Sequence, residues 1–498
     1  MKNKIITIWA ITAALALTSC SQIQNESKPY GPENTGAVGT GSVSDISDHE
    51  MYGQNGYNSV KIAENGFVDV NENATSTFSA DVDTASYSML RRLITSGYDL
   101  ADLIGTAGGG IRTEELINYF RYECGQPAEG EPFGVKARLT ACPWNAENKL
   151  LTLTVAAESR QTSQKNNLVF LVDVSGSMSS EDKLPLLKRT FTYLLSNLGD
   201  DDTVSIVTYA SGETVVLEGC RGSRRDTIKQ ALDSLEARGS TNGEAGLRRA
   251  YEIAEKYSSA DSNNRIIIAS DGDLNVGMSS VSEIESFVEE KRGAGVYLSV
   301  LGFGFGNYRD AVMETIADKG NGAYYYIDGE TEAERIFGDE LTSTLYTVAD
   351  DVKFRVTFDP EAVSMYRLIG YENRQLQEQD FANDAKDAGE VGAGSMITVA
   401  YELVTADDPR APYFTLDVRY KKPGGEKSEL FTYTADDSIV CEPDADTDLI
   451  AALCELSMIL NDSVYKGTST VDSVIRLTDH EYGDPYKAQF AELVRRLE

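Results

Sequence analysis

Three groups of carboxylate and hydroxyl side chains could meet in one site. The first is Asp173–Ser177, an Asp-x-Ser-x-Ser motif that directly follows the apolar run 168–172. The second is the loop Gly239–Thr241, and the third is Ser270–Asp273, directly after the apolar run 265–269. These groups offer oxygen ligands only, because no Cys or His lies near them in the sequence. An all-oxygen set is suited to a hard divalent ion such as Mg²⁺ or Mn²⁺.

The middle of the chain alternates short apolar runs with helical stretches. This pattern predicts a doubly wound, mainly parallel α/β sheet that is covered by helices on both faces. In such a sheet ligands bind at the carboxyl ends of the strands, which is where the motifs at Asp173 and Asp271 fall. The strands are expected at 168–172, 204–207, 265–269, 297–301 and 323–327, and the helices near 181–197, 226–237, 243–258, 281–293 and 331–346.

The proposed ligand set leaves room for a partner. Mg²⁺ prefers six oxygen ligands in octahedral geometry, and these side chains cannot supply six without water. An acidic side chain of a partner could replace one of the waters. Two carboxylates roughly neutralise a dication, so the ion would still attract a third carboxylate.

These residues resemble the metal-ion-dependent adhesion site (MIDAS) of von Willebrand factor A domains. The resemblance covers the strand before Asp173, the Gly-x-Thr loop at Thr241 and the Asp-Gly pair at Asp271. It implies a von Willebrand A, Rossmann-like fold, with Mg²⁺ as the expected ion and Mn²⁺ as the alternative. It also implies that Asp273 and Asn275 support the loop. The metal-site residues implied by the resemblance, some of them binding through water, are Asp173, Ser175, Ser177, Thr241 and Asp271.

Longer strings on both sides of this unit carry a second resemblance. Residues 76–87 and 114–120, followed by 366–374 and 384–390, are similar to the flanking domains of a family of bacterial von Willebrand A lipoproteins, the YfbK-like proteins. The resemblance runs from about residue 61 to the end of the chain. It implies an architecture and a location in the cell envelope, and no established ligand.

The first residues predict export and lipid anchoring. Lys2 and Lys4 precede an apolar stretch, 5–17, that is too short to span a membrane. The segment ends in Leu17–Cys20, which resembles a bacterial lipobox, so we expect cleavage before Cys20 and attachment of a diacylglycerol to its thiol. The alternative is an ordinary signal peptide with an incidental Cys. The expected location is the outer membrane, with the periplasmic or surface side left open.

We therefore predict five segments. They are a signal peptide (1–19), a flexible tether rich in Ser, Asn and Gly (20–60), a helical N-terminal flanking segment that ends in strands (61–162), the von Willebrand A domain (163–347) and a β-rich plus helical C-terminal domain (348–498). Strands before residue 160 and after residue 351 could pair into a β-sandwich into which the central domain is inserted.

Composition excludes several functions. The 498 residues carry 45 basic and 79 acidic side chains, a net charge of −34, which disfavours binding to nucleic acid. The only histidines, His49 and His480, exclude a multi-histidine zinc site and leave little room for a Ser-His-Asp triad, and we predict no catalytic residue. Beyond Cys20 five cysteines remain, an odd number, so at least one cannot pair within the chain. Their pairing is left open: Cys124, Cys142, Cys220, Cys441 and Cys454.

The favoured hypothesis is a non-enzymatic, lipid-anchored envelope protein that binds an acidic side chain of a protein partner through a divalent cation in a MIDAS. One alternative is a structural scaffold of the envelope in which the ion only stabilises the fold. The other is a metal-dependent hydrolase. A hydrolase needs a general base, and only an acidic residue such as Asp273 or Glu244 could provide one near the motifs. The oligomeric state is left open.

Overall fold

The computed structural model describes most of the chain after residue 60. The described ranges are 61–159, 164–240, 243–259, 262–272, 281–305, 310–340, 343, 345–406 and 412–498. Cys20, His49, Thr241, Asp273 and Asn275 lie outside the described residues, as do the whole predicted signal peptide and tether. Within the described ranges, no helix combines the length and apolar character that crossing a bilayer requires.

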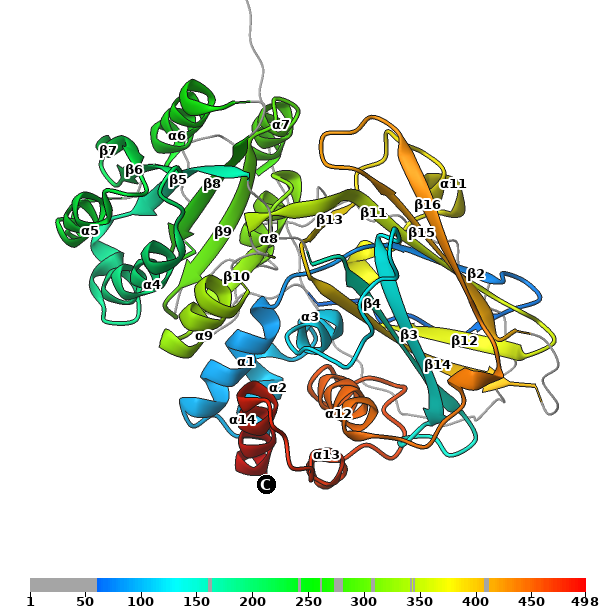
Figure 1. The fold of residues 1–498 in the computed structure, drawn as a ribbon. Coiled ribbons are helices and arrows are strands. Elements are labelled where there is room, and N and C mark those ends of the chain that lie inside the picture. Colours follow the sequence, from blue (N-terminus) through cyan, green and yellow to red (C-terminus); the bar gives the residue numbers. More distant parts are fainter. Residues whose placement is uncertain are drawn as a thin grey trace, which may run out of the picture. The chain divides into compact units, whose positions relative to one another are not determined.

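The central part of the chain forms a six-stranded sheet in the order β10-β9-β8-β5-β6-β7 (Figure 1). All neighbouring strands are parallel except β6 and β7, which are antiparallel. The predicted fold class is therefore confirmed. The strands are β5 (Lys165–Asp173), β6 (Thr203–Tyr209), β7 (Glu213–Arg221), β8 (Ser262–Ser270), β9 (Tyr297–Phe303) and β10 (Tyr324–Ile327).

Helices cover both faces of this sheet because successive side chains of each strand point to opposite sides. On β5, Val169 and Leu171 belong to one buried core together with Leu247 of α6, whereas Phe170 belongs to another core together with Phe191 of α4. The continuous apolar runs in the sequence follow from this two-sided burial. The helices are α4 (Leu184–Asn197), α5 (Arg225–Asp233), α6 (Glu244–Tyr257), α7 (Val281–Arg292) and α8 (Asp310–Lys319).

After β10 the chain does not continue as the uniform helix that was expected at 331–346. A short α-helix, α9 (Glu330–Glu334), gives way to a π-helical turn, η3 (Arg335–Asp339). The wider turn accommodates the buried Arg335, which bonds Glu332 at 2.6 Å and Glu340 at 2.7 Å. Its guanidinium carbon lies 4.1 Å from the centroid of the Tyr119 ring.

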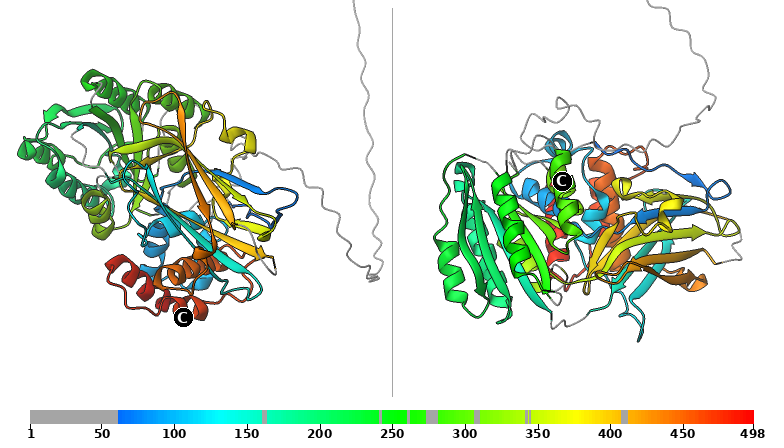
Figure 2. Two further views of the ribbon diagram at one scale, coloured as in Figure 1. Left: turned by 45° about the vertical axis from the view of Figure 1, so that its right-hand side comes forward. Right: turned by 90° about the horizontal axis from the view of Figure 1, so that it is seen from above.

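The expected pairing of strands from the two ends of the chain is confirmed. β4 pairs with β14, β1 with β12 and β2 with β11, all antiparallel, so each of two five-stranded sheets combines N-terminal with C-terminal strands (Figure 2). Both sheets contribute to one hydrophobic core. The strands are β1 (Val68–Asp69), β2 (Thr75–Ser79), β3 (Phe133–Ala141), β4 (Lys149–Ala157), β11 (Thr347–Phe358), β12 (Val363–Ile369), β13 (Gly389–Gly392), β14 (Met396–Thr405), β15 (Phe414–Lys421) and β16 (Ser428–Ala435).

The remaining helices also join the two ends of the chain. The Tyr87 ring of α1 stacks on Tyr119 at 3.9 Å between centroids and lies 6.1 Å from Phe490 of α14. Thr113 of α3 and Ser457 of α12 share a buried hydrogen bond of 2.7 Å. These helices are α1 (Ala85–Thr95), α2 (Leu100–Ala107), α3 (Thr113–Asn118), α11 (Glu378–Phe381), α12 (Ala445–Leu460), α13 (Val471–Leu477) and α14 (Pro485–Val494).

The cysteines and the C-terminal histidine have structural surroundings. All five described cysteines are free thiols, and Cys454 is fully buried in α12. Burial raises the pKa of the Cys142 thiol to about 12, so this thiol is protonated at neutral pH. His480 lies in the loop before α14 and shares a hydrogen bond of 2.8 Å with Asp448.

If β2 belongs to the C-terminal sheet, truncating its central side chain must destabilise the fold. Phe78 is fully buried and lies against Phe354 and Tyr371, with ring centroids 5.4 and 5.0 Å away. We expect Phe78→Ala to lower the free energy of unfolding by about 3–5 kcal/mol in urea denaturation, through lost burial and an unfilled cavity. Val464→Ala is the matched control, because Val464 is 81% exposed. Equal losses in the two variants would contradict this role of β2.

Candidate metal centre

Asp173 is the last residue of β5, in the middle of the parallel sheet, and it is fully buried. The backbone N–H of Ser175 donates to Asp173 Oδ1 at 2.8 Å, and the Ser270 hydroxyl donates to Oδ2 at 3.4 Å. Ser270 is the last residue of β8, which pairs in parallel with β5. The ends of two adjacent strands therefore fix this carboxylate from both sides.

The loop after Asp173 carries the two serines of the motif, of which only the second reaches the surface. Ser175 is buried and Ser177 is exposed, and their hydroxyl oxygens lie 2.9 Å apart. The fully buried side chain of Met178 anchors the short helical turn that follows. The group of oxygens thus extends from a buried carboxylate to a hydroxyl that faces solvent.

The second loop is bonded to the first along its backbone. The N–H of Gly176 donates to the carbonyl of Gly239 at 3.0 Å, and the N–H of Arg238 donates to the carbonyl of Val174 at 2.7 Å. These bonds bring the chain as far as Ser240 beside the serine loop. Thr241, the next residue, lies outside the described residues, so its place in the ligand set stays a prediction.

Asp271 follows β8 and is buried, with an exposed fraction of 6%. Lys183 Nζ donates to Asp271 Oδ2 at 2.7 Å. Asp271 Oδ1 is buried and has no hydrogen-bond partner among the described residues. A buried carboxylate oxygen without a donor is costly, so this atom is suited to an additional ligand.

The electrostatics also favour a bound cation. The pKa of Asp173 is raised to about 6, chiefly because the carboxyl is buried and in part because of the charge of Asp271, while hydrogen bonds from Ser175 and Ser270 oppose the rise. Burial, together with the charge of Asp173, raises the pKa of the Tyr209 hydroxyl well above its usual range. Two carboxylates in a poorly solvated place repel each other, and a divalent ion would relieve that repulsion. The donor set and the unpartnered oxygen fit a hard cation.

The structure thus gathers four of the five predicted metal-site residues, Asp173, Ser175, Ser177 and Asp271, at one edge of the sheet. Sequence reasoning did not single out Lys183, and it gave Ser270 no role at Asp173. Ser270 could have been found from its place at the end of an apolar run, next to Asp271. Whether the four bind an ion stays a prediction.

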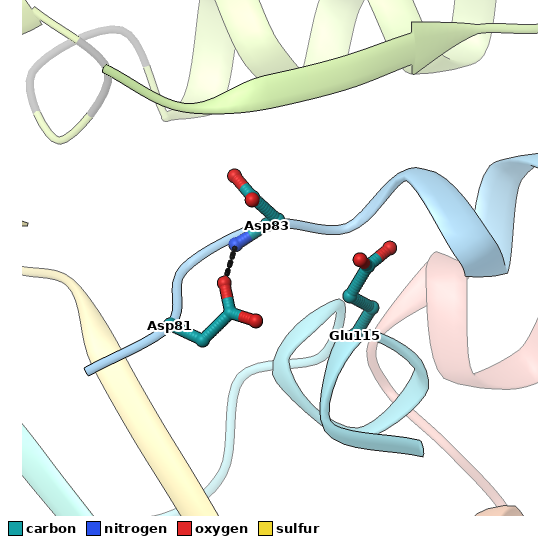
Figure 3. Close-up of side chains that lie close together, drawn as sticks. All are labelled: Asp81, Asp83 and Glu115. Carbon is teal, nitrogen blue, oxygen red and sulfur yellow. Dashed lines mark hydrogen bonds between the residues drawn. The ribbon is translucent and has the colours of Figure 1, made fainter. Parts of the chain in front are cut away.

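A second acidic group lies elsewhere in the described structure. One oxygen from each of Asp81, Asp83 and Glu115 lies within 4.8 Å of the others, and all three residues are buried (Figure 3). Protein donors already occupy their oxygens. Asp81 accepts from the Asp83 N–H at 3.0 Å, and Glu115 accepts from the Ser86 N–H at 2.6 Å. Asp83 accepts from the Tyr324 N–H at 2.7 Å.

Two arginines complete the bonding of this group. Arg374 donates to Asp81 at 3.3 Å and to Asp83 at 3.1 Å, and Arg112 pairs with Glu115. These donors explain the cluster as a buried ion network, so we assign no metal to it. The network belongs to the junction between the central sheet and the flanking segments.

Helix α8 supplies the other side of this junction. Asp318 bonds Arg374 at 2.7 Å, and Glu314 contacts Arg112 at 3.2 Å and accepts from Asn373 at 2.7 Å. With Asp81, Asp83 and Glu115, the junction holds five carboxylates against two guanidinium groups. The pKa of Glu314 is raised to about 8, chiefly because the carboxyl is buried. The two arginines lower this pKa, and Asp318 and Glu115 raise it.

This raised pKa predicts a pH-dependent stability. Between the ordinary pKa of 4.5 and about 8, folded Glu314 holds a proton that the unfolded chain releases, so its contribution to stability falls as pH rises through this window. Glu314→Gln stays neutral and can still accept from Asn373. In urea denaturation between pH 5 and pH 9, the wild type should lose about 4 kcal/mol more than the variant, at about 1.36 kcal/mol per pKa unit.

The matched control is Glu492→Gln, which removes an exposed carboxylate of α14. Its stability should follow the wild type at every pH. Parallel curves for the wild type and Glu314→Gln would contradict the proposed protonation of Glu314.

The comparisons with known proteins cover nearly the whole chain. Residues 167–339 match the model of the von Willebrand factor type A domain, and residues 52–152 match a model described as von Willebrand factor. Residues 343–412 and 405–498 match the model described as "Uncharacterized protein YfbK, C-terminal". The uncharacterized protein YfbK of Escherichia coli K12 is 36% identical over 463 residues, which span 87% of this chain and 79% of that protein. The chain belongs to the YfbK family.

More distant similarities are confined to part of the chain or to the fold. Human inter-alpha-trypsin inhibitor heavy chain H3 is 26% identical over 191 residues, which cover 36% of this YfbK relative and 21% of the human protein. A solved von Willebrand factor type A protein from Catenulispora acidiphila is 15% identical with a TM-score of 0.44, covering 76% of this chain and 91% of that one.

Membership of the YfbK family confirms the resemblance found in the sequence. Von Willebrand A domains commonly bind a divalent cation, typically mediate binding between proteins and are generally non-enzymatic. The candidate metal centre at the ends of β5 and β8 is therefore the first place to seek the function of this chain.

Proposed function

We propose that this chain is a non-enzymatic binding protein of the bacterial envelope that engages a protein partner through a divalent cation. One observation carries the proposal. Asp173 and Asp271 are buried side by side at the carboxyl ends of adjacent parallel strands, and Asp271 Oδ1 has no protein donor among the described residues. A cation of high charge density is the ligand that this arrangement favours.

The residues that would hold the ion are Asp173, Ser175, Ser177, Thr241 and Asp271, some of them through water. Mg²⁺ is the proposed ion and Mn²⁺ the alternative, because both accept ligand sets made only of oxygen. When bound, the ion supplies a positive charge that an acidic side chain of the partner can contact. The exposed hydroxyl of Ser177 marks the side from which that partner would approach.

Net charge supports a role for the ion in binding. The chain carries a formal charge of −34, so its surface repels other acidic proteins over long distances. A bound dication would create a local positive centre in an otherwise acidic surface. The same net charge argues against nucleic acid as a partner.

The location is proposed from the N-terminal residues. Cleavage after residue 19 would leave Cys20 to carry the lipid, and residues 20–60 would tether the folded part to the membrane. Two or more acyl chains give stable anchoring, whereas a single chain is marginal. We propose the outer membrane, and the domain limits 61–162, 163–347 and 348–498, as working assignments.

A structural scaffold is the second candidate, and the junction favours it. The ion network around Arg374 binds α8 of the central sheet to the flanking segments, which is expected of a molecule that bears load or holds a fixed shape. In that case the cation would stabilise the fold without contacting a partner. For the metal-dependent hydrolase, Glu244 accepts a hydrogen bond of 3.0 Å from Arg248 and Asp273 lies outside the described residues, so neither candidate base gives a reason to favour that alternative.

Metal-dependent stability tests the first step. At an ion concentration about 100 times Kd, binding to the folded state alone stabilises it by about 2.7 kcal/mol. We expect Mg²⁺ or Mn²⁺ to raise the melting temperature of the wild type relative to EDTA, and to leave Asp173→Ala unchanged. Asp201→Ala, which removes an exposed carboxylate, should respond as the wild type does. No shift at millimolar ion would contradict a metal site.

A capture experiment separates the binding protein from the scaffold. Envelope proteins should be retained by the immobilised wild type in Mg²⁺ and released by EDTA, at a temperature where the metal-free protein is still folded. Retention that is equal with and without the ion would favour the scaffold.

A further inference from the structure

Lys183 places a positive charge inside the metal centre. Its ammonium bonds Asp271 Oδ2 at 2.7 Å, and the two side chains are only 15% and 4% exposed. Lys183 is also the N-cap residue of α4, whose first turn contains no acidic side chain. A cation at a helix N-terminus opposes the helix dipole, so this position does not serve the stability of α4.

The path of the Lys183 side chain is built into the fold. A Cβ atom on Gly304, directly after β9, would lie 2.2 Å from Lys183 Cε and 2.6 Å from Cγ, so the aliphatic stem lies against the backbone of this glycine. Gly304 has φ +76°, and its carbonyl accepts a hydrogen bond of 2.6 Å from the Tyr326 hydroxyl. The Lys183 stem crosses the end of β9, and its ammonium group lies at the end of β8.

The neighbouring acidic residue does not compete for this ammonium. Asp182 bonds Arg92 of α1 at 2.5 Å through Oδ2 and accepts from the Ser180 hydroxyl at 2.5 Å through Oδ1. With both Asp182 oxygens occupied, Lys183 pairs with Asp271. The pairing uses only Oδ2, and Asp271 Oδ1 has no hydrogen-bond partner within the described part of the chain, so an ion at Oδ1 and the ammonium at Oδ2 can share one carboxylate.

This charge changes what the site attracts. Asp173 and Asp271 alone would give the site a charge of −2, which neutralises a dication. With the Lys183 ammonium included, the negative charge of the site is only −1. Like charges repel across a poorly solvated site, so the ammonium weakens the binding of the ion. Once a dication is bound, the site carries a net charge of +1, which one carboxylate of a partner would neutralise.

We propose that Lys183 is a built-in counter-cation that weakens divalent-ion binding by itself and makes it depend on an anionic carboxylate ligand. The inference rests on the proposed function, because it assumes that the ion binds at Asp173 and Asp271. It adds that the ion and the acidic partner bind cooperatively, and it assigns this coupling to one residue.

The test is the affinity of the full chain for Mn²⁺ alone, followed by the electron paramagnetic resonance signal of the free ion. Lys183→Met keeps an aliphatic stem over Gly304 and removes the charge, and Lys183→Gln also keeps a hydrogen-bond donor for Asp271. We expect both variants to bind Mn²⁺ more tightly than the wild type, on the order of tenfold. A positioning role without the charge effect would instead weaken binding in Lys183→Met.

Acetate, as the simplest carboxylate, tests the coupling. Compared with chloride at equal ionic strength, it should strengthen Mn²⁺ binding to the wild type and have little effect on Lys183→Met. Lys183→Arg should behave as the wild type does. Lys229→Met, which removes an exposed lysine paired with Asp233, controls for net charge and should also match the wild type.

Each outcome decides between the two proposals. If the wild type binds Mn²⁺ no better than Asp173→Ala does, the proposed function fails and the inference fails with it. If the wild type binds Mn²⁺ and removal of the Lys183 charge leaves the affinity unchanged or lower, only the role of Lys183 is overturned. Thermal unfolding without metal confirms that each variant is folded.

Discussion

The repulsion between two buried carboxylates is the constraint on which the candidate metal centre depends. Because β5 and β8 run parallel and side by side, Asp173 and Asp271 leave the sheet at the same edge. Backbone and hydroxyl donors stabilise Asp173, and Lys183 stabilises Asp271, yet one oxygen of Asp271 stays without a donor among the described residues. The parallel sheet thus places two buried carboxylates at one edge, an arrangement that a cation would stabilise.

Where the flanking segments meet the central sheet, arginine side chains rather than a metal ion neutralise the buried carboxylates. At α8, Arg374 and Arg112 bond the buried carboxylates directly. Directly after β10, Arg91 of α1 bonds Asp328 at 2.5 Å and Glu332 at 2.7 Å. Guanidinium groups can bond several carboxylates in fixed geometry, so these contacts orient the segments as well as neutralise them. At the candidate metal centre, by contrast, no guanidinium group is found bonded to Asp173 or Asp271 among the described residues.

Much of this arrangement could be predicted from the sequence. The continuous apolar runs before Asp173 and Asp271 indicated buried parallel strands, and their carboxyl ends indicated the site. The segment 61–162 was expected to begin with helices and end in strands, and β3 and β4 are those strands. These features depend on local patterns of burial, which a sequence displays directly.

Features that depend on tertiary contacts were missed. The antiparallel edge strand β7 is only partly buried along most of its length, so it lacks the apolar run that marked its neighbours. The π-helical turn at Arg335 arises from buried ion pairs with Glu332 and Glu340, and no local pattern announces it. Lys183 reaches Asp271 across 88 residues of sequence because Gly304 leaves room for its stem.

The most direct test of a cation held by these loops is anomalous diffraction from crystals of the full chain grown with Mn²⁺. The account predicts one strong anomalous peak at the carboxyl ends of β5 and β8, bordered by Asp173, Ser175, Ser177 and Asp271. A peak at the cluster of Asp81, Asp83 and Glu115 instead, or no peak at the strand ends at millimolar Mn²⁺, would contradict it.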